Sequence, residues 1–374
     1  MSRRATTIRL GLEADFWTIA SGAAAAQIAF ALLVWIYGES PRAMAAMVVS
    51  GTWGSAYGIG QVLFKATPLL FTGLAVHVAL RAGLFNVGAE GQLAIASLAV
   101  GAVGAWLPAG IPWIAAVPLL VVVAIVAGTL WAAPAAVLRV RGAHEVISTI
   151  LLNRVADALV GLLLGLGLAH GGTVRTADVA PHARLSPLSA YFPALEGSAA
   201  STAIAIAIVL VALILWVLPR TRAGREAELV AQNDEACRVE GISVNWRRAQ
   251  ALLISGGIAG LASLGTVLGY KGYFERGLGA GAGFTGLAVA ILGRGRLAGI
   301  VFAALLFGTL AQGGLVINAY VPAEVMEVIQ GVVIVAVALG DARLRAWLGE
   351  RIRALVVTQV AGSAKRDGAD GEGA

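Results

Sequence analysis

Charge is the scarcest property of this sequence. Only 13% of its 374 residues are charged, whereas 59% are hydrophobic. A soluble globular domain carries roughly 25% charged residues, and a soluble chain of this size could not hide so much apolar surface from water. Disordered chains are rich in charge and poor in apolar residues, so the composition excludes disorder as well. We therefore expect a protein that uses lipid as part of its solvent.

Cysteine and lysine are also rare. The single cysteine, Cys237, excludes an internal disulfide framework and supplies no metal-ligand cluster. The three lysines, Lys65, Lys271 and Lys365, do not follow a glycine, so the chain has no phosphate-binding Walker loop. We expect no cofactor in this chain, and any ATP used with it must be hydrolysed by another polypeptide.

The basic residues indicate a membrane protein rather than a nucleic-acid partner. The net charge is +6, but the arginines fall between apolar runs, as the positive-inside rule expects. Arg3, Arg4 and Arg9 place the N-terminus inside, and most later arginines fall on the same side. The first apolar run is too long for a signal peptide and lacks a clear cleavage site after it, so we interpret it as an anchor.

Ten apolar segments approach the length of about 20 residues that a membrane-spanning helix needs. The 48 glycines favour close helix packing. We predict an all-α polytopic membrane protein with about ten transmembrane helices and cytoplasmic N- and C-termini. Its parts would be an N-terminus over 1–15, a transmembrane domain over 16–340 and a tail over 341–374 with a disordered end. The uncharged runs are Phe16–Tyr37, Trp113–Leu138, Ala199–Leu218, Ala249–Tyr270 and Leu297–Ile317. The shorter or interrupted ones are Ala66–Leu80, Asn86–Trp106, Val146–Ala169, Gly277–Gly293 and Val325–Gly340.

Two polar stretches interrupt the apolar segments. Residues 170–198 are predicted to form an outer loop, and residues 219–248 an inner one. Within the inner loop, Arg225 to Glu240 is compatible with a short helix that Gly241 ends. Its few, small apolar positions suit a helix that docks into a cleft of a partner protein. An ordinary solvated loop is an equally good interpretation.

One hexapeptide occurs twice. Phe-Thr-Gly-Leu-Ala-Val stands at Phe71–Val76 and again at Phe284–Val289. Related halves are common in transporters. In a chain so rich in alanine, glycine, leucine and valine, coincidence is an equally good explanation.

The densest group of polar residues lies between two apolar segments, at Arg81 to Gln92. Asn86, Glu90 and Gln92 supply hydrogen-bonding groups where polar side chains are costly and usually face a bundle interior or a water-lined path. A turn at Asn86 could present the free N–H groups of a following half-helix to a ligand. The alternative is a helix hairpin in which Glu90 pairs with Arg81.

Other polar residues within apolar segments have more ordinary explanations. Arg154 and Asp157, next to Asn153, are spaced to form a neutralising pair within one helix. Gln330 either lines a polar path or bridges neighbouring helices, as single amides in membranes do. An intramembrane enzyme would need a catalytic pair such as His144 and Glu145, but no second histidine follows at the spacing of a zinc site.

Three motifs, in this order, resemble one family. They are the stretches Gly83–Gln92, Glu145–Asn153 and Gln232–Ile242. Together they are similar to the membrane permeases of bacterial ABC importers for branched-chain amino acids, simple sugars and nucleosides. The nearest group is the nucleoside and simple-sugar permeases that work with basic-membrane-protein-type receptor lipoproteins. The resemblance covers the chain from about Pro68 to Gly340.

The resemblance implies a multi-pass subunit of the bacterial inner membrane without a catalytic centre. It implies three protein partners: a second permease, related or identical; a cytoplasmic ATPase that binds ATP and Mg²⁺; and an outer substrate-binding lipoprotein. The solute would be small and hydrophilic, either a nucleoside or a simple sugar. Gln232 and Asp234 depart from the family pattern, which puts the start of the coupling helix in doubt. The predicted substrate path has Asn86, Glu90, Gln92, Asn153 and Gln330, and the predicted ATPase contact has Glu226, Asn233, Glu235, Ala236, Arg238 and Gly241.

An ion- or proton-coupled secondary transporter is the main competing interpretation. It is prompted by Glu90, Arg154 and Asp157, because ionisable groups within membrane segments often form proton or ion pathways.

Overall fold

The computed structural model describes residues 23–337 of the chain. Over this range the backbone is helical or irregular, with two isolated β-bridges, Arg175 to Glu275 and Pro187 to Ser201, and no named strand. The predicted all-α class is thus confirmed for the part that is described. The expected N-terminal segment 1–15 and the tail 341–374 lie outside it.

Two compact units are distinguished along the chain. The larger one comprises Arg42–Glu324, and the smaller one contains the described residues 23–41 and 325–337. The smaller unit includes the helix Ala23–Ile36 and helical residues up to 337. The α-helices of the larger unit are α2 (Pro41–Thr52), α3 (Ala56–Leu80), α4 (Ala89–Trp106), α5 (Trp113–Val140), α6 (Glu145–Leu163), α7 (Ala203–Val217), α8 (Arg222–Gln232), α9 (Asp234–Val239), α10 (Val244–Gly260), α11 (Ala282–Leu292) and α12 (Leu297–Ile317). Short helical turns are η1 (Leu164–Leu168), η2 (Pro181–Ala183), η3 (Leu188–Ala190), η4 (Pro193–Leu195) and η5 (Leu264–Lys271).

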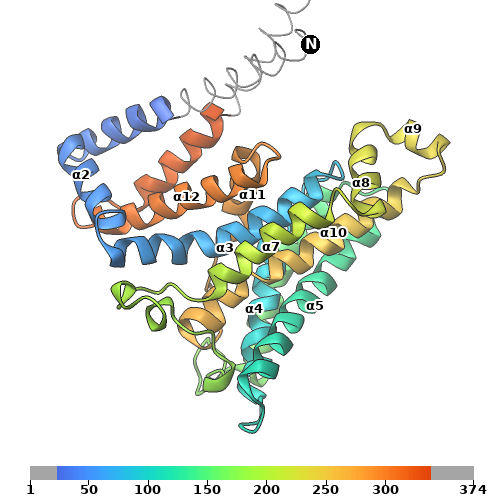
Figure 1. Ribbon diagram of the computed structural model, residues 1–374, viewed down its shortest axis with the longest axis horizontal. Helices are drawn as coiled ribbons and strands as arrows, with labels where there is room; N and C mark the ends of the chain where they lie inside the picture. Colours follow the sequence, from blue (N-terminus) through green and yellow to red (C-terminus); the bar gives the residue numbers. More distant parts are fainter. Residues whose placement is uncertain (1–22, 338–374) are drawn as a thin grey trace, which may run out of the picture. The chain divides into compact units, whose positions relative to one another are not determined.

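Helices α3 and α10 form the interior of the larger unit. In their most apolar stretches, 83% of α3 and 89% of α10 with η5 is buried, against 22% for α5 and 28% for α6 with η1. Figure 1 shows α3, α10 and α5 running alongside one another. Glycines permit this approach: a Cβ on Gly128 of α5 would lie 2.2 Å from the carbonyl oxygen of Gly256 of α10. Small residues at such positions bring membrane helices into backbone contact.

Among residues 23–337, five helices are long and apolar enough to cross a membrane, or up to seven if each bent pair counts as one span. The expectation of about ten spans is therefore not confirmed. The Gly277–Gly293 segment shows one reason, because its helix α11 begins only at Ala282 and has 11 residues. Gly277, Gly279 and Gly281 all have positive φ values, which interrupt a right-handed helix before that point.

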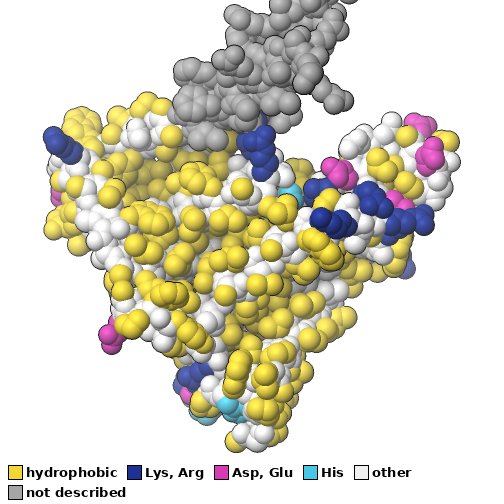
Figure 2. Space-filling model, in the orientation of Figure 1, with side chains coloured by type: hydrophobic (Ala, Val, Ile, Leu, Met, Phe, Trp, Pro, Cys, Tyr) yellow, Lys and Arg dark blue, Asp and Glu magenta, His cyan; other side chains and the backbone are white. Residues whose placement is uncertain are grey.

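The exposed side chains of the larger unit separate by type. Much of the face drawn in Figure 2 is hydrophobic, as expected for a surface that meets lipid. Lysine and arginine side chains gather where α8 and the start of α10 lie. The apolar face together with the long apolar helices fits a multi-pass membrane protein.

The two copies of the repeated hexapeptide pack against each other. A Cβ on Gly73 of α3 would lie 2.7 Å from Cγ1 of Val289 in α11, and one on Gly286 would lie 2.2 Å from Oγ1 of Thr72. The Thr72 hydroxyl also donates to the carbonyl oxygen of Ala282, at 2.8 Å. The third-position glycine of each copy thus makes room for the other copy. The repeat has a packing role in the contact between α3 and α11.

Candidate functional site

A cavity of about 290 Å³ lies among α4, α6, α11 and the loop before α11. Two aromatic side chains, aliphatic side chains of α4 and α6 (Leu93, Ala94, Ile150 and Val160) and a run of loop backbone supply the apolar part of its wall, and five side chains of the lining are polar or charged. The polar lining residues are Glu90, Asn153, Arg154, Asp157 and Arg276. The loop and aromatic residues are Phe274, Gly277, Leu278, Gly279, Ala280 and Phe284.

Glu90 holds the start of α11. Its Oε1 accepts the N–H of Gly281 at 2.6 Å, and its Oε2 accepts the N–H of Gly283 at 2.8 Å. A carboxylate satisfies the otherwise unpaired N–H groups at a helix N-terminus and is favoured by the helix dipole. The alternative in which Glu90 pairs with Arg81 is wrong, because Arg81 pairs with Glu228 of α8 instead.

Asn86 and Gln92 belong to a buried network beside the cavity and are not among its lining residues. The Asn86 side chain donates to Oε1 of Gln92 at 2.9 Å and to Oγ of Ser255 at 2.7 Å, and it accepts the N–H of Gly88 at 2.9 Å. The Ser255 hydroxyl donates to the carbonyl oxygen of Ala75 in α3. These amides join α3, α4 and α10, so their contact with solute stays a prediction.

Asn153 reaches from α6 to the start of α4. Its Oδ1 accepts the N–H of Gly91 at 2.9 Å, and its Nδ2 donates to the carbonyl oxygen of Val87 at 2.9 Å. The first turn of α4 therefore does not present free N–H groups of Gly88 and Gly91 to a ligand, because Asn86 and Asn153 already accept them.

The expected pair between Arg154 and Asp157 is wrong. Asp157 binds Arg276 of the loop before α11, with 2.9 Å between Nη2 and Oδ2. Arg154 lines the cavity, and its guanidinium, which forms no ion pair or hydrogen bond among residues 23–337, acts on Asp157 only through a longer-range electrostatic attraction. The spacing along α6 gave no sign of the distant partner, since Arg276 comes from another element. Gln330 belongs to the smaller unit, and its place in a substrate path stays a prediction.

The predicted helix over 225–240 consists of two helices. α8 ends at Gln232, and Asn233 takes an extended conformation with φ −156° and ψ 103°. The Asn233 side chain accepts the N–H groups of Glu235 and Ala236, both at 3.0 Å, and so begins α9. Asparagine is among the residues most favoured at this capping position. Gly241, with φ +75°, follows α9 and confirms the predicted stop.

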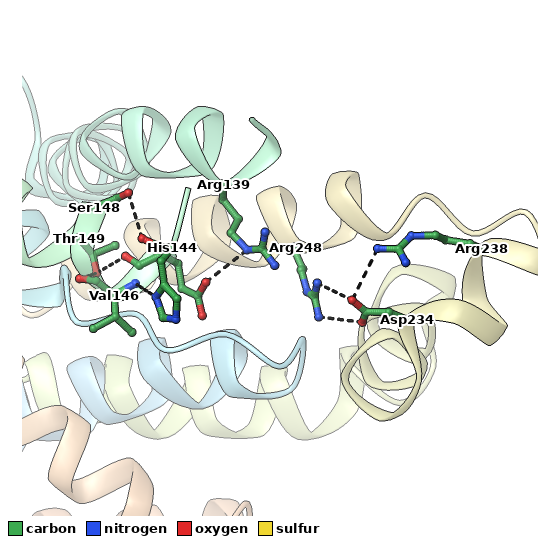
Figure 3. A network of polar contacts seen from close by, with 9 residues as sticks. Arg139, His144, Val146, Ser148, Thr149, Asp234, Arg238 and Arg248 are labelled. Carbon is green, nitrogen blue, oxygen red and sulfur yellow. Dashed lines mark hydrogen bonds and ion pairs between the residues drawn. The ribbon is translucent and has the colours of Figure 1, made fainter. Parts of the chain in front are cut away.

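Ion pairs attach α8 and α9 to α10. Asp234 at the start of α9 receives two hydrogen bonds from Arg248 of α10, at 2.7 and 2.8 Å, with Arg238 on its other side (Figure 3). Glu226 of α8 is buried between Arg222 and Arg247. Arg222 above all, together with Arg247, lowers the pKa of the Glu226 carboxyl below its ordinary value of 4.5, although burial acts in the opposite direction.

The outward face of α8 and α9 carries exposed side chains of mixed character. Leu229 is 48% exposed and Val239 is 84% exposed, while Cys237 is buried on the inner side against Val230 and Val244. Single exposed apolar side chains are common on protein surfaces, so the contact of this face with a partner protein stays a prediction. The predicted contact residues on this face are Glu235, Ala236 and Arg238, all exposed.

Residues 58–338 match the family of permease components of branched-chain amino acid transport systems. The chain belongs to this permease family. It is 36% identical to a glucose ABC transporter permease of Haloferax volcanii, over 76% of each chain. It is 33% identical to a guanosine ABC transporter permease of Bacillus subtilis, over 82% of this chain and 88% of the relative. A nucleoside ABC transporter permease of Lactococcus lactis is 29% identical, over 76% and 80% of the two chains.

Membership confirms the resemblance seen in the three motifs and makes the chain the non-catalytic translocation component of an ABC transporter. Such a permease works in general with an ATPase and a substrate-binding protein. The His144–Glu145 pair has a structural explanation in the permease. His144 accepts the N–H of Val146 at the start of α6 (Figure 3), and Glu145 pairs with Arg139.

Several residues of the site were not predicted from the sequence of the permease. Phe284 lines the cavity from the glycine-rich segment Gly277–Gly293 that is predicted as a span, and Arg276 lines it from the residue just before that segment. Arg81 and Arg248 bind the α8–α9 segment, a role that was not predicted for either arginine. The glycines at 277, 279 and 281, at every second position, are the sequence feature that indicates a loop before α11.

Proposed function

We propose that this permease carries a nucleoside or a simple sugar across a bacterial inner membrane, driven by ATP and Mg²⁺ bound in a separate cytoplasmic ATPase. A substrate-binding lipoprotein would deliver the solute, and a second permease subunit, related or identical, would complete the membrane part. The charges of the side chains that line the cavity are the observation that supports this class of solute. Its two carboxylates, Glu90 and Asp157, balance its two guanidinium groups, Arg154 and Arg276, so it favours a neutral solute rich in hydroxyl groups over a charged one.

Arg154 is the cavity residue best placed to bind this solute. Its guanidinium donors are not engaged in an ion pair or hydrogen bond within residues 23–337, whereas Glu90, Asp157 and Arg276 already have partners. Phe284 is half-exposed at the wall and offers a ring face to a sugar or a base. The names of the glucose and guanosine relatives support the same solute classes.

The engaged acids argue against the secondary-transporter interpretation. A proton- or ion-coupled carrier needs a carboxylate that binds and releases the ion. Glu90 is committed to two backbone N–H groups, and Asp157 is committed to Arg276. Uptake that survives removal of the ATPase and collapses with an uncoupler would contradict the proposal.

The solute test uses proteoliposomes that contain the permease with its co-purified ATPase and binding protein. We expect Arg154→Ala to lower uptake of guanosine or glucose about tenfold, since one charged hydrogen bond is worth roughly 1.5–3 kcal/mol. The matched control is Arg141→Ala, an exposed arginine outside the cavity. Equal uptake by both variants would refute the assigned role of Arg154.

The ATPase contact is tested separately by co-purification. Glu235→Trp on the exposed face of α9 should abolish association with the ATPase, because a bulky ring prevents close docking of the helix. The control is Glu196→Trp, an exposed glutamate in the loop 170–198. Unchanged association of the Glu235 variant would count against α9 as the docking helix.

A further inference from the structure

The turn between α3 and α4, residues 81–88, touches α8 at one end. Arg81 ends α3, and its guanidinium binds the Glu228 carboxylate of α8 at 2.5 Å. Two residues later the backbone of the turn lies against the same helix. A Cβ on Gly83 would be 3.2 Å from Cα of Ala231, and the φ of +72° at Gly83 also favours glycine. The turn is thus engaged by α8 through both a charge pair and direct packing.

The other end of the same turn leads to the cavity. α4 begins at Ala89, and Glu90 in its first turn binds the N–H groups of Gly281 and Gly283 at the start of α11. The cavity wall over Gly277–Ala280 directly precedes these groups. A shift of the α4 start therefore moves the start of α11 and the wall together.

The middle of the turn is held too firmly to absorb such a movement. Asn86 is fully buried and bonded to Gln92, Ser255 and the N–H of Gly88. The carbonyl oxygen of Val87 accepts a hydrogen bond from Asn153. Packed, fully hydrogen-bonded segments move as units, and such units can carry coupling between distant sites.

We propose that the turn 81–88 transmits movement of α8 to the contact between Glu90 and α11, and that Arg81 is the positioning residue that engages α8. This inference rests on the proposed function, in which the ATPase acts on α8 and α9. It predicts reciprocal effects, since a coupling free energy between two sites acts in both directions. Solute bound in the cavity should change the rate of ATP hydrolysis, and movement of α8 should change the position of the cavity wall.

Loss of the Arg81 pair leaves α8 and α9 attached elsewhere. Arg247 still binds Glu226, and Arg248 still binds Asp234, so both helices stay on α10. Only the charge pair with the turn is removed, and the packing of Gly83 against Ala231 remains. The expected defect is therefore in coupling rather than in assembly.

The test compares uptake per ATP hydrolysed in proteoliposomes that contain the permease, its ATPase and its binding protein, with guanosine and glucose as probes. In Arg81→Ala and in Glu228→Ala the ATPase should still bind, while uptake per ATP falls about fivefold or more, the lower end of usual coupling factors. The charge exchange, Arg81→Glu with Glu228→Arg, should recover much of the ratio. Rescue by exchange would assign the defect to the Arg81–Glu228 pair, and a lower uptake per ATP with unchanged ATPase binding is the result that a merely structural role of Arg81 does not give.

The control is Arg139→Ala, which breaks the pair between Arg139 and Glu145 without a contact to α8. We expect it to lower thermal stability and leave uptake per ATP unchanged. Wild-type uptake per ATP in both Arg81→Ala and Glu228→Ala would overturn the inference, as would loss of ATPase binding in these variants or failure of the exchange to rescue. If Arg81→Ala does not fold, Glu228→Gln decides in the same way. Absence of ATPase binding by the wild-type chain would instead overturn the proposed function.

Discussion

The cavity and the α8–α9 segment hold their polar groups by different means. Around the cavity, Glu90, Asn86 and Asn153 bind backbone groups, and Asn86 is fully buried. On α8 and α9, carboxylates bind guanidinium groups of graded exposure: the Arg222 side chain is 84% exposed, whereas those of Arg247 and Arg248 are 18% and 13% exposed. Among apolar helices an unpaired N–H is costly, whereas exposed ion pairs contribute little to stability. The first set therefore stabilises the fold, and the second chiefly sets the position of the segment.

The largest expected effect tests the cavity side of this comparison. Glu90→Ala should lower the free energy of unfolding in detergent by about 3 kcal/mol, because two N–H groups of α11 lose a charged acceptor. Glu90→Gln should cost roughly half as much, since the amide keeps one acceptor oxygen. If wild type and Glu90→Ala were equally stable, the N–H groups at the start of α11 would have another hydrogen-bond acceptor.

The buried amide network should give the next largest effect. Asn86→Ala leaves Gln92 and Ser255 without the partner between them, and we expect a loss of about 2 kcal/mol in the free energy of unfolding. The control is Ser50→Ala, an exposed hydroxyl that donates to the carbonyl oxygen of Met47. Its change should stay within roughly 0.5 kcal/mol. A similar change in both variants would remove the distinction between the two regions.

The contact between the two repeat copies predicts a smaller effect. Gly286→Ala places a methyl group against Thr72, and the strain should cost about 1–2 kcal/mol in unfolding free energy. Gly165→Ala is the matched control, because open space surrounds that position. Tolerance of alanine at Gly286 would mean that α3 and α11 separate easily.

The smallest expected effect is the loss, at acid pH, of the stability that Glu226 of α8 provides. The folded-state pKa of Glu226 is lowered from 4.5, so its pairing with Arg222 and Arg247 adds stability above pH 4.5. This stability is lost as the pH falls through the lowered pKa. Thermal unfolding followed from about pH 6 to pH 3 should show a steeper loss in the wild type than in Glu226→Gln. Parallel curves would exclude Glu226 as the titrating group.

Local sequence signals predicted some elements closely. The run Leu297–Ile317 is the α12 helix to the residue, because arginines precede this uncharged run and polar Asn318 follows it. Gly241 was correctly expected to end a helix, since glycine takes the positive φ that the turn after α9 needs. These cases depend on neighbouring residues alone.

Other elements could not be predicted because the deciding partner is far along the chain. Asp157 binds Arg276 rather than Arg154, and Glu90 binds Gly281 rather than Arg81. In each case a local pairing was possible, and packing of distant helices offered a different one.

Composition and motif order by themselves determined that this protein lies in a membrane, is helical and is a permease, because apolar excess and short motifs are properties of the chain. Tertiary structure alone decided that Glu90 holds α11, that Arg81 meets α8 and that Arg154 stays unpaired at the cavity among the described residues. The physical reason is that polar groups among apolar helices bind whatever partner close packing brings within reach, and glycine contacts set which helices approach.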